Sequence, residues 1–375
     1  MESPNRAYLP AVDHLRAFAA LLILLYHSVH LLYPRLAFHR AWQPDDWPHT
    51  GNPLLAALLE GHSAVALFLV ISGFILTYGS LGRNIRWPEF YRNRLLRIFP
   101  LYLFVLFTGA NSFPQKFKFP EFLSSLFQFG YLAGGLSFGE WTGVTWSIAV
   151  EAHLYLLFPA VLHYLNAGRL WALLRLAVLV WLVRFAAVSM GAGMLDVTYW
   201  TVLGRTDQFL GGAILAWLVH RYGMPRSLRW FFPVAAAGVV GVLWGFHESG
   251  GWPGHQEWRI LWPIAEASIW TAFVAGYLAV APLLPRFADS ALRYLGKVSY
   301  SVYLIHVPVI TILATKSWFL NISGASAFGN TLLTAIFEVL PVSVAFASLT
   351  WSVIEEPFLA MRRRYGQSQP TTANQ

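Results

Sequence analysis

Long apolar segments follow one another along almost the whole chain, and only short polar stretches separate them. A bilayer core about 30 Å thick is crossed by about 20 apolar residues in a helix, which matches these segments. Only 12% of the residues are charged, about half the usual share in soluble domains. The pattern predicts an all-α polytopic membrane helix bundle of about ten transmembrane helices, at residues 11–33, 58–79, 95–112, 147–166, 170–190, 199–219, 230–247, 260–281, 298–319 and 330–354.

Basic residues between these segments indicate the orientation, because Lys and Arg concentrate in cytoplasmic loops. Acidic pairs mark the loops at 34–57 and 247–258, which we therefore place outside. Ten crossings fit these markers, so a weaker apolar segment at 120–135 is expected to be a re-entrant or interfacial helix. Both termini are then cytoplasmic, together with the basic segments at 80–94, 220–229, 284–297 and 362–364.

The rest of the composition narrows the possible functions. The net charge of +8 is explained by the cytoplasmic loops and does not indicate nucleic-acid binding. The chain has no cysteine, which excludes disulfides, thiolate metal sites and acyl-cysteine intermediates. No cleavable signal pattern precedes the first apolar segment, which we expect to act as its own insertion signal. We expect one transmembrane domain at 1–361 and a polar cytoplasmic tail at 362–375.

Arg16 and His27 share one apolar segment and stand eleven residues apart. Eleven steps of 100° leave them about 20° apart around a helix, so they share one face, about 16 Å apart along the axis. Ionisable side chains inside a membrane helix are costly and are usually functional. As alternatives, Arg16 is a positive-inside anchor and His27 a packing residue. His27 and His30 also have a spacing that metals use, but no third ligand stands at a matching offset, so no metal is expected.

Further polar residues lie within or beside the predicted helices. Ser72 precedes Gly73, a pair typical of close helix packing, although a serine beside a base is also a nucleophile. Arg94 and Arg97 are one helical turn apart and suited to paired phosphate contacts, or they are topology markers together with Arg92.

The segments WSIAVE and GKVSYSVYLIHVP carry the remaining candidates. Glu151 stands inside a predicted helix, where a carboxylate needs a partner, so a structural ion pair and a catalytic role are both open. Ser299, Tyr303 and His306 share one face at spacings of four and three. His306 either lines a cavity or bonds a backbone carbonyl near Pro308. Glu266 and Glu338 are intramembrane carboxylates without an assigned role.

Seven motifs occur in one order along residues 13–358, and together they resemble the acyltransferase-3 family of bacterial integral membrane O-acyltransferases. They are the Arg16–His27 pair, SGF at 72–74, RNRLLRIFPLY at 92–102, WSIAVE at 146–151, RTDQFLGG at 205–212, LGKVSYSVYLIHVP at 295–308 and IEEPF at 354–358.

The resemblance implies roles for several of these residues. Arg16 and His27 match the essential pair of the family, Arg94 and Arg97 its basic motif, and the segment from Trp146 to Glu151 its tryptophan-to-glutamate motif. His306 matches a late histidine and Glu355 a terminal glutamate. The residue after that glutamate is usually basic in the family but is Glu356 here, which puts one charge contact in doubt. The absence of a fused hydrolase-like domain suggests a standalone form.

The resemblance also implies a function: transfer of an acyl group, most often acetyl from acetyl-CoA, to a hydroxyl of a carbohydrate, glycolipid or exopolysaccharide at the bacterial inner membrane. His27 is the expected general base, with an acyl-histidine as the alternative. Catalysis is expected to involve Arg16 and Glu151 as well, and Arg16, Arg94 and Arg97 to bind CoA phosphates. Ser72, Trp146, Ser299, Tyr303, His306 and Glu355 are expected to line or support the cavity.

Two other function classes use the same residues differently. A transporter or flippase for an anionic lipid-linked saccharide would use the arginines and carboxylates for binding and proton coupling. Internal inverted repeats typical of transporters are not evident in the sequence. A non-catalytic scaffold would leave the intramembrane charges unexplained.

Overall fold

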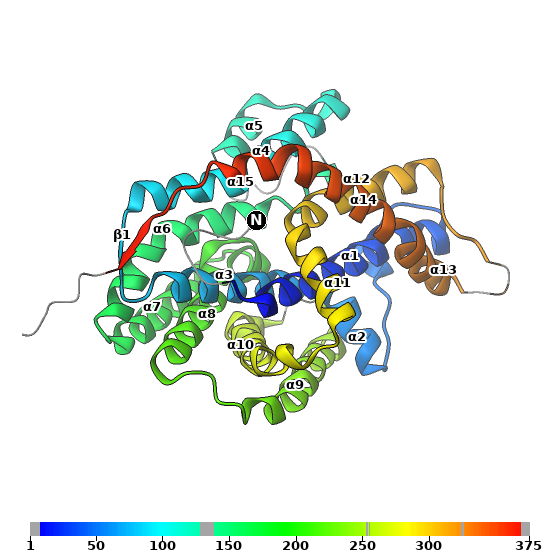
Figure 1. Cartoon of the computed structure of the whole chain (residues 1–375). Coiled ribbons are helices and arrows are strands. Elements are labelled where there is room, and N and C mark those ends of the chain that lie inside the picture. The colour runs from blue at the N-terminus through cyan, green and yellow to red at the C-terminus, as the bar shows by residue number, and fades with distance from the viewer. Residues whose placement is uncertain are drawn as a thin grey trace, which may run out of the picture.

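The computed structural model describes residues 8–127, 139–252, 254, 256–322, 324 and 326–368. In these residues nearly all regular structure is helical (Figure 1). The longer helices are α1 (Pro10–Phe38), α3 (Ala64–Ser80), α4 (Trp87–Ser112), α6 (Trp146–Asn166), α7 (Leu170–Ser189), α8 (Val202–Tyr222), α9 (Leu228–Glu248), α10 (Trp262–Val280), α11 (Arg286–Lys297) and α12 (Ser299–Lys316).

Shorter elements complete the described chain. Two three-residue strands, β1 (Arg83–Ile85) and β2 (Gly366–Ser368), pair antiparallel. The short helices are α2 (Pro53–Leu59), α5 (Phe119–Leu126), α13 (Ala327–Thr334), α14 (Leu340–Thr350) and α15 (Glu356–Ala360). The single turns are η1 (Pro44–Asp46), η2 (Gly61–Ser63), η3 (Pro114–Lys116), η5 (Gly139–Thr142), η6 (Asp196–Trp200), η7 (Glu257–Leu261), η8 (Ala281–Leu283), η9 (Ala335–Val339) and η10 (Trp351–Glu355).

The prediction of an all-α polytopic membrane bundle is confirmed. Within the described residues, eight helices are long and apolar enough to cross a membrane, and the bent pair α11–α12 provides a ninth. The last of the eight, Ala327–Ala360, joins α13, α14 and α15 through the π-helical turns η9 and η10. The remaining predicted span, 199–219, corresponds to α8, which carries buried Arg205 and Asp207. Its 21 residues extend about 32 Å.

Helix α1 lies near the middle of the bundle in Figure 1 and packs against several other helices. It begins at Pro10 and has Asp13 in its first turn, where a fixed φ and a negative charge favour helix initiation. It packs against α3, α11, α12 and α13, so both ends of the sequence contribute its neighbours (Figure 1). The buried face of α1 is therefore enclosed by helices from distant parts of the chain.

Helices α3 and α8 approach each other at backbone distance through small residues. A Cβ atom at Gly73 would overlap the carbonyl oxygen of Phe209, and one at Gly212 would overlap the carbonyl oxygen of Val70. Close packing at the Ser72–Gly73 pair is therefore confirmed for Gly73, as small-residue motifs in membrane helices predict. This contact fixes the position of α3, which carries Ser72.

Buried ion pairs join the helices on the other side of α8. Arg184 of α7 lies 2.6 Å from a carboxylate oxygen of Asp207. Arg205 lies 2.9 Å from Glu266 of α10. Glu266 thus has a structural partner that its sequence context did not reveal. Glu338, in contrast, has one buried carboxylate oxygen without a hydrogen bond among the described residues.

The chain bends by 69° between α11 and α12. Gly296, just before the bend, lies against the backbone of Asp13, where a Cβ atom would not fit. The bend lays α11 across the start of α1 (Figure 1). The predicted segment at 298–319 is thus α12 preceded by a separate helix.

The predicted helix at 120–135 corresponds in its first part to α5. Tyr102 of α4 donates a 2.7 Å hydrogen bond to the carbonyl oxygen of Ser125, which attaches α5 to α4. Residues 128–135 lie outside the described part of the chain. The re-entrant or interfacial placement of this segment stays a prediction.

Candidate active site

A cavity of about 600 Å³ lies between α1, α3, α4, α6, α11 and α12, with walls completed by η10, α15 and the residues that follow. This volume is within the usual range for small-molecule and cofactor pockets. Seven of the residues singled out from the sequence line it: Arg16, Ser72, Arg94, Arg97, Glu151, Ser299 and Tyr303. Residues from six helices, distant in sequence, therefore meet around one space.

Basic side chains dominate the charge of this cavity. Six line it, whereas three acidic residues, Asp13, Glu151 and Glu356, do so. The basic residues are Arg16, Arg94, Arg97, Arg293, Lys297 and Arg362. Such an excess in a partly buried space favours an anionic ligand.

The arginines differ in how far the protein satisfies them. Arg97 forms a 2.7 Å ion pair with Glu355 and lies over the ring of Tyr300. Arg94 lies 5.7 Å from the ring centres of Phe90 and Tyr155, and its buried Nε has no hydrogen-bond partner. Among the described residues no ion pair or hydrogen bond involves Arg16. Arg16 and Arg94 thus keep donors available to a ligand.

Glu151 is held by hydroxyl groups. Ser72 and Tyr155 both donate to its Oε1 atom, Tyr155 at 2.6 Å. Ser72 and Glu151 come from α3 and α6, whereas Tyr155 is one helical turn beyond Glu151. Within the described residues Glu151 forms no ion pair; hydroxyl groups hold its carboxylate, which also lines the cavity.

His27 and His306 form a second group beside the cavity and do not line it. Nδ1 of His27 lies 3.0 Å from Nε2 of His306. Nδ1 of His306 lies 3.0 Å from the carbonyl oxygen of Val302. A carbonyl only accepts, so neutral His306 has its proton on Nδ1 and accepts at Nε2. His27 then has its proton on Nδ1, which leaves its Nε2 unprotonated.

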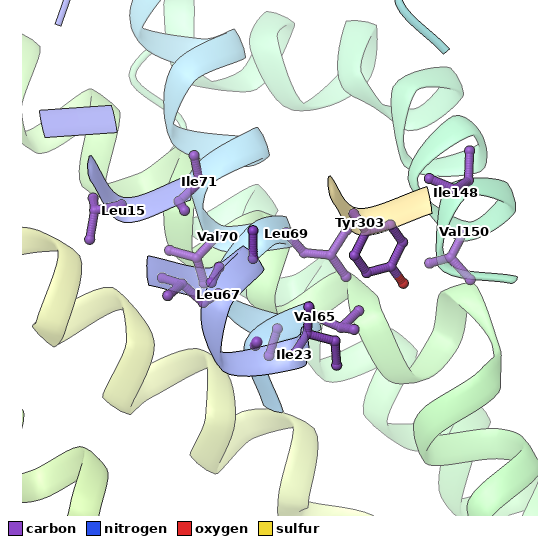
Figure 2. Close-up of a cluster of buried hydrophobic side chains, with 14 of the residues drawn as sticks. Leu15, Ile23, Val65, Leu67, Leu69, Val70, Ile71, Ile148, Val150 and Tyr303 are labelled. Atoms are coloured by element: carbon purple, nitrogen blue, oxygen red, sulfur yellow. The ribbon is translucent and has the colours of Figure 1, made fainter. Parts of the chain in front are cut away.

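Tyr303 lines the cavity and also lies beside His306. Its hydroxyl lies 2.6 Å from the hydroxyl of Ser147 and donates to the carbonyl oxygen of Val144 at 3.0 Å. Its ring centre lies 6.0 Å from that of His306. Figure 2 shows the ring directed toward α6, with Leu69 on its other side. Tyr303 therefore contacts both the cavity and the histidine pair.

Besides His306, two other predicted support residues, Trp146 and Glu355, lie outside the cavity lining. Trp146 packs on Tyr199 and Trp200, with ring centres 4.9 and 4.8 Å away, and on the Arg205 guanidinium. Glu355 pairs with Arg97 and accepts a hydrogen bond from Ser301. Glu355 therefore orients a cavity residue, whereas Trp146 supports the neighbouring helix.

The cavity also contains basic residues that the sequence analysis treated only as orientation markers: Arg293, Lys297 and Arg362. Lys297 lies 3.5 Å from the ring centre of Trp351, and Arg293 pairs with Asp289 at 3.5 Å. Burial lowers the pKa of Arg362 to about 10, and repulsion from Arg97 and Arg94 contributes to the decrease. No periodic pattern marked these residues, because basic loops already have a topological explanation.

Histidine spacing had left a metal site as an alternative. His27 contacts His306, whereas His30 stacks on Trp42 with ring centres 4.4 Å apart. Within the described ranges no group of three or more His, Cys, Asp or Glu side chains could hold a metal ion. The absence of a metal stays a prediction.

Comparison with known proteins identifies a matching protein family. Residues 9–353 match a family model described as an acyltransferase domain. Nodulation protein 10 of Rhizobium leguminosarum bv. viciae is 26% identical, and the alignment covers 93% of each chain. O-acetyltransferase OatA of Staphylococcus aureus is 25% identical over 83% of this chain and 51% of its own length. No solved structure matches.

A further relative is a putative peptidoglycan O-acetyltransferase, YrhL of Bacillus subtilis. It is 25% identical over 95% of this chain and 56% of its own length. The chain therefore spans about half the length of OatA and YrhL.

Proposed function

Because the chain belongs to the acyltransferase family that its residues 9–353 match, we propose that it transfers an acetyl group from acetyl-CoA to a carbohydrate hydroxyl. The family resemblance inferred from the motifs is confirmed, and with it the prediction of a membrane acyltransferase. The identity of the acyl donor, that of the acceptor and the roles of the site residues are our proposal.

The observation that carries this proposal is the position of the basic cavity next to the histidine pair. Arg16 and Arg94 offer donors without protein partners, and Tyr303 contacts the cavity and His306 alike. CoA carries several phosphates at one end and a thioester at the other. A cavity with arginines along its walls and a base beside one end suits such an elongated anion.

Donor binding is assigned to the arginines. Arg94 and Arg97 face the cavity from consecutive turns of α4, as their spacing predicts. Guanidinium groups bind phosphate through paired, charge-assisted hydrogen bonds. Arg97 is oriented by Glu355, whereas Arg16 and Arg94 form no ion pair among the described residues and gain the most from a bound phosphate.

The chemical step is assigned to His27. Its unprotonated Nε2 takes the proton of the acceptor hydroxyl while the hydroxyl oxygen forms a bond to the acyl carbon. The carbon–sulfur bond of the thioester breaks, and the departing thiolate receives the proton. General-base catalysis of this kind is typically worth about 10²–10⁴-fold in rate. His306 holds the tautomer that this role requires.

The names of two relatives support acetyl and a glycan. OatA is named an O-acetyltransferase and YrhL a putative peptidoglycan O-acetyltransferase. The basic segments that contribute Arg293, Lys297 and Arg362 are those predicted to be cytoplasmic. The donor would thus enter from the cytosol of a bacterial inner-membrane protein with both termini inside.

The test uses purified full-length protein in detergent with acetyl-CoA and peptidoglycan fragments or surface polysaccharide as acceptors. Since the chain has no cysteine, a thiol reagent reports released CoA without background from the protein. We expect CoA release that depends on acceptor, and a product heavier by one acetyl group in mass spectrometry. Absence of both, with movement of a lipid-linked saccharide across reconstituted vesicles, would establish the transporter alternative instead.

A further inference from the structure

The residues that follow α15 return across the bundle to α4 and β1 (Figure 1). We name residues 361–368 the C-terminal strap. Its last three residues form β2, which pairs with β1. The amide nitrogen of Arg86 donates to the carbonyl oxygen of Tyr365 at 2.9 Å. The strap lies beyond residues 9–353, so the family match does not cover it.

A buried asparagine anchors the middle of the strap. The side chain of Asn93 is fully buried in α4. Its Nδ2 donates to the carbonyl oxygen of Arg363 at 2.7 Å, and its Oδ1 accepts from the amide nitrogen of Arg363 at 3.0 Å. Both halves of one amide therefore bond the same strap residue, which fixes the register of the strap on α4. Arg94, the next residue of α4, lines the cavity.

This register places two strap side chains, Arg362 and Tyr365, in the cavity wall. Tyr365 is 3% exposed and packs edge-on against Phe90, with ring centres 5.4 Å apart. Arg362 uses its Nε for a 3.0 Å bond to the carbonyl oxygen of Leu359. Among the described residues Arg362 has no ion pair, and its terminal nitrogens have no hydrogen bond.

The positive charges around Arg362 favour the binding of an anion. Arg97, Arg94 and Arg16 repel it, and among its electrostatic neighbours only Tyr365 acts in the opposite direction. Of these, Arg97 is paired with a carboxylate, Glu355. Glu356 lines the same cavity without an ion pair to Arg362. A phosphate in this place would bond to guanidinium groups whose repulsion otherwise costs stability.

We propose that the C-terminal strap is part of the donor site: Arg362 binds a phosphate group of the CoA nucleotide, and Asn93 is the positioning residue that holds the strap for it. This inference rests on the proposed function. It assigns donor recognition to a segment outside the family match.

The experiment measures the affinity of full-length protein for CoA by calorimetry in detergent. Arg362→Ala is expected to weaken CoA binding by about tenfold or more, and Arg362→Lys to restore part of the loss. The matched control is Arg364→Ala, which removes the same charge from an exposed strap side chain that does not line the cavity. Thermal unfolding of each variant verifies that the fold is retained.

A double-mutant cycle tests the positioning role. Asn93→Ala is expected to raise KM for acetyl-CoA while leaving kcat close to that of the wild type. In the Asn93→Ala background, Arg362→Ala should cost much less than it does alone, because the two residues act as one unit. Additive losses would overturn the role of Asn93.

The outcomes separate the two proposals. Wild-type protein that binds no CoA would overturn both. Wild-type binding with an unchanged Arg362→Ala affinity would overturn only the strap. A lipid phosphate is the other possible source of the anion, so native mass spectrometry follows retained phosphatidylglycerol. Loss of that lipid in Arg362→Ala with unchanged CoA affinity would assign the phosphate to a lipid and also overturn the strap.

Discussion

At the scale of single residues, one backbone carbonyl sets which ring nitrogens of the two histidines carry protons. Val302 fixes the tautomer of His306, and His306 fixes that of His27. The tautomer of a histidine is set by the partner of its other nitrogen. The tautomer of His27 therefore depends on a residue far away in sequence, and this dependence was not visible in the spacing of Arg16 and His27.

His27→Ala should reduce acetyl transfer by about 10²–10⁴-fold, because it removes the proposed general base. CoA affinity should stay nearly unchanged, since His27 does not line the cavity. Acetyl transfer to glycan and calorimetric CoA binding are the measurements. His30→Ala is the control, since it removes an imidazole of the same helix that stacks on Trp42. Near wild-type activity in His27→Ala would exclude the assignment.

Arg16→Lys should weaken acetyl-CoA binding by about an order of magnitude, because it keeps the charge and loses the planar pair of donors. Arg16 lies in the cavity wall without a protein partner among the described residues, so the loss should appear in affinity. Calorimetry with the purified variant checks this. If Arg16→Lys kept full affinity and His27→Ala lost it, the division between donor binding and chemistry would be reversed.

At the scale of helices, α3 and α8 are set by their glycines. Gly212→Ala should lower the thermal unfolding midpoint, because the new methyl group overlaps the carbonyl oxygen of Val70 and overpacking costs about 1–3 kcal/mol. Gly241→Ala in α9 is the matched control: no atom lies within 4 Å of its added Cβ, and alanine favours the helix by up to about 1 kcal/mol. Equal midpoints for the two variants would contradict backbone contact between α3 and α8.

The buried pair of Arg205 and Glu266 is the next feature at this scale. Glu266→Gln should destabilise the protein by about 3–5 kcal/mol, since it leaves a buried guanidinium without its counter-charge. CoA affinity should not change, because neither residue lines the cavity. Glu338→Gln is the control, a carboxylate without an ion pair in the described chain. Thermal unfolding in detergent is the measurement. An unfolding temperature of Glu266→Gln equal to that of the wild type would refute the structural role of the ion pair.

Helix positions were largely predictable, and the exceptions have physical reasons. Apolar runs predicted the spans because lipid demands about 20 apolar residues in each. Helix α4 begins at Trp87 instead of the predicted 95, since Pro88 starts a helix well and the basic turn that follows hid this part from a prediction based on apolar runs. The bend between α11 and α12 had no signal in composition.

At the scale of the whole molecule, the orientation awaits a direct measurement. The positive-inside rule places residue 226 in the cytoplasm and residue 257 outside. Single cysteines at these exposed positions have no background, since the chain has none. We expect an impermeant thiol reagent to label Glu257→Cys and not Arg226→Cys in cells with a permeabilised outer membrane. The opposite labelling pattern would show that the bundle has the inverse orientation in the membrane.

The candidate site was predictable only in part. Arg16, Arg94, Arg97 and Glu151 all reach the cavity, because helix periodicity places them on the correct faces. Arg362 was not recognised as a cavity residue, since its place depends on hydrogen bonds to Asn93 and on strand pairing between segments far apart. Helix periodicity predicts which face of its own helix a residue occupies. It does not predict which distant segment packs against that face.

The central position of α1 has a consequence for biosynthesis. His27 leaves the ribosome 279 residues before His306, which corresponds to roughly 14–56 s at about 5–20 residues per second. For that period the first span carries a guanidinium and an imidazole without α11 and α12, which later pack against it. Membrane insertion of this protein should therefore depend most on factors that keep the polar side chains of α1 away from lipid until the later helices are translated.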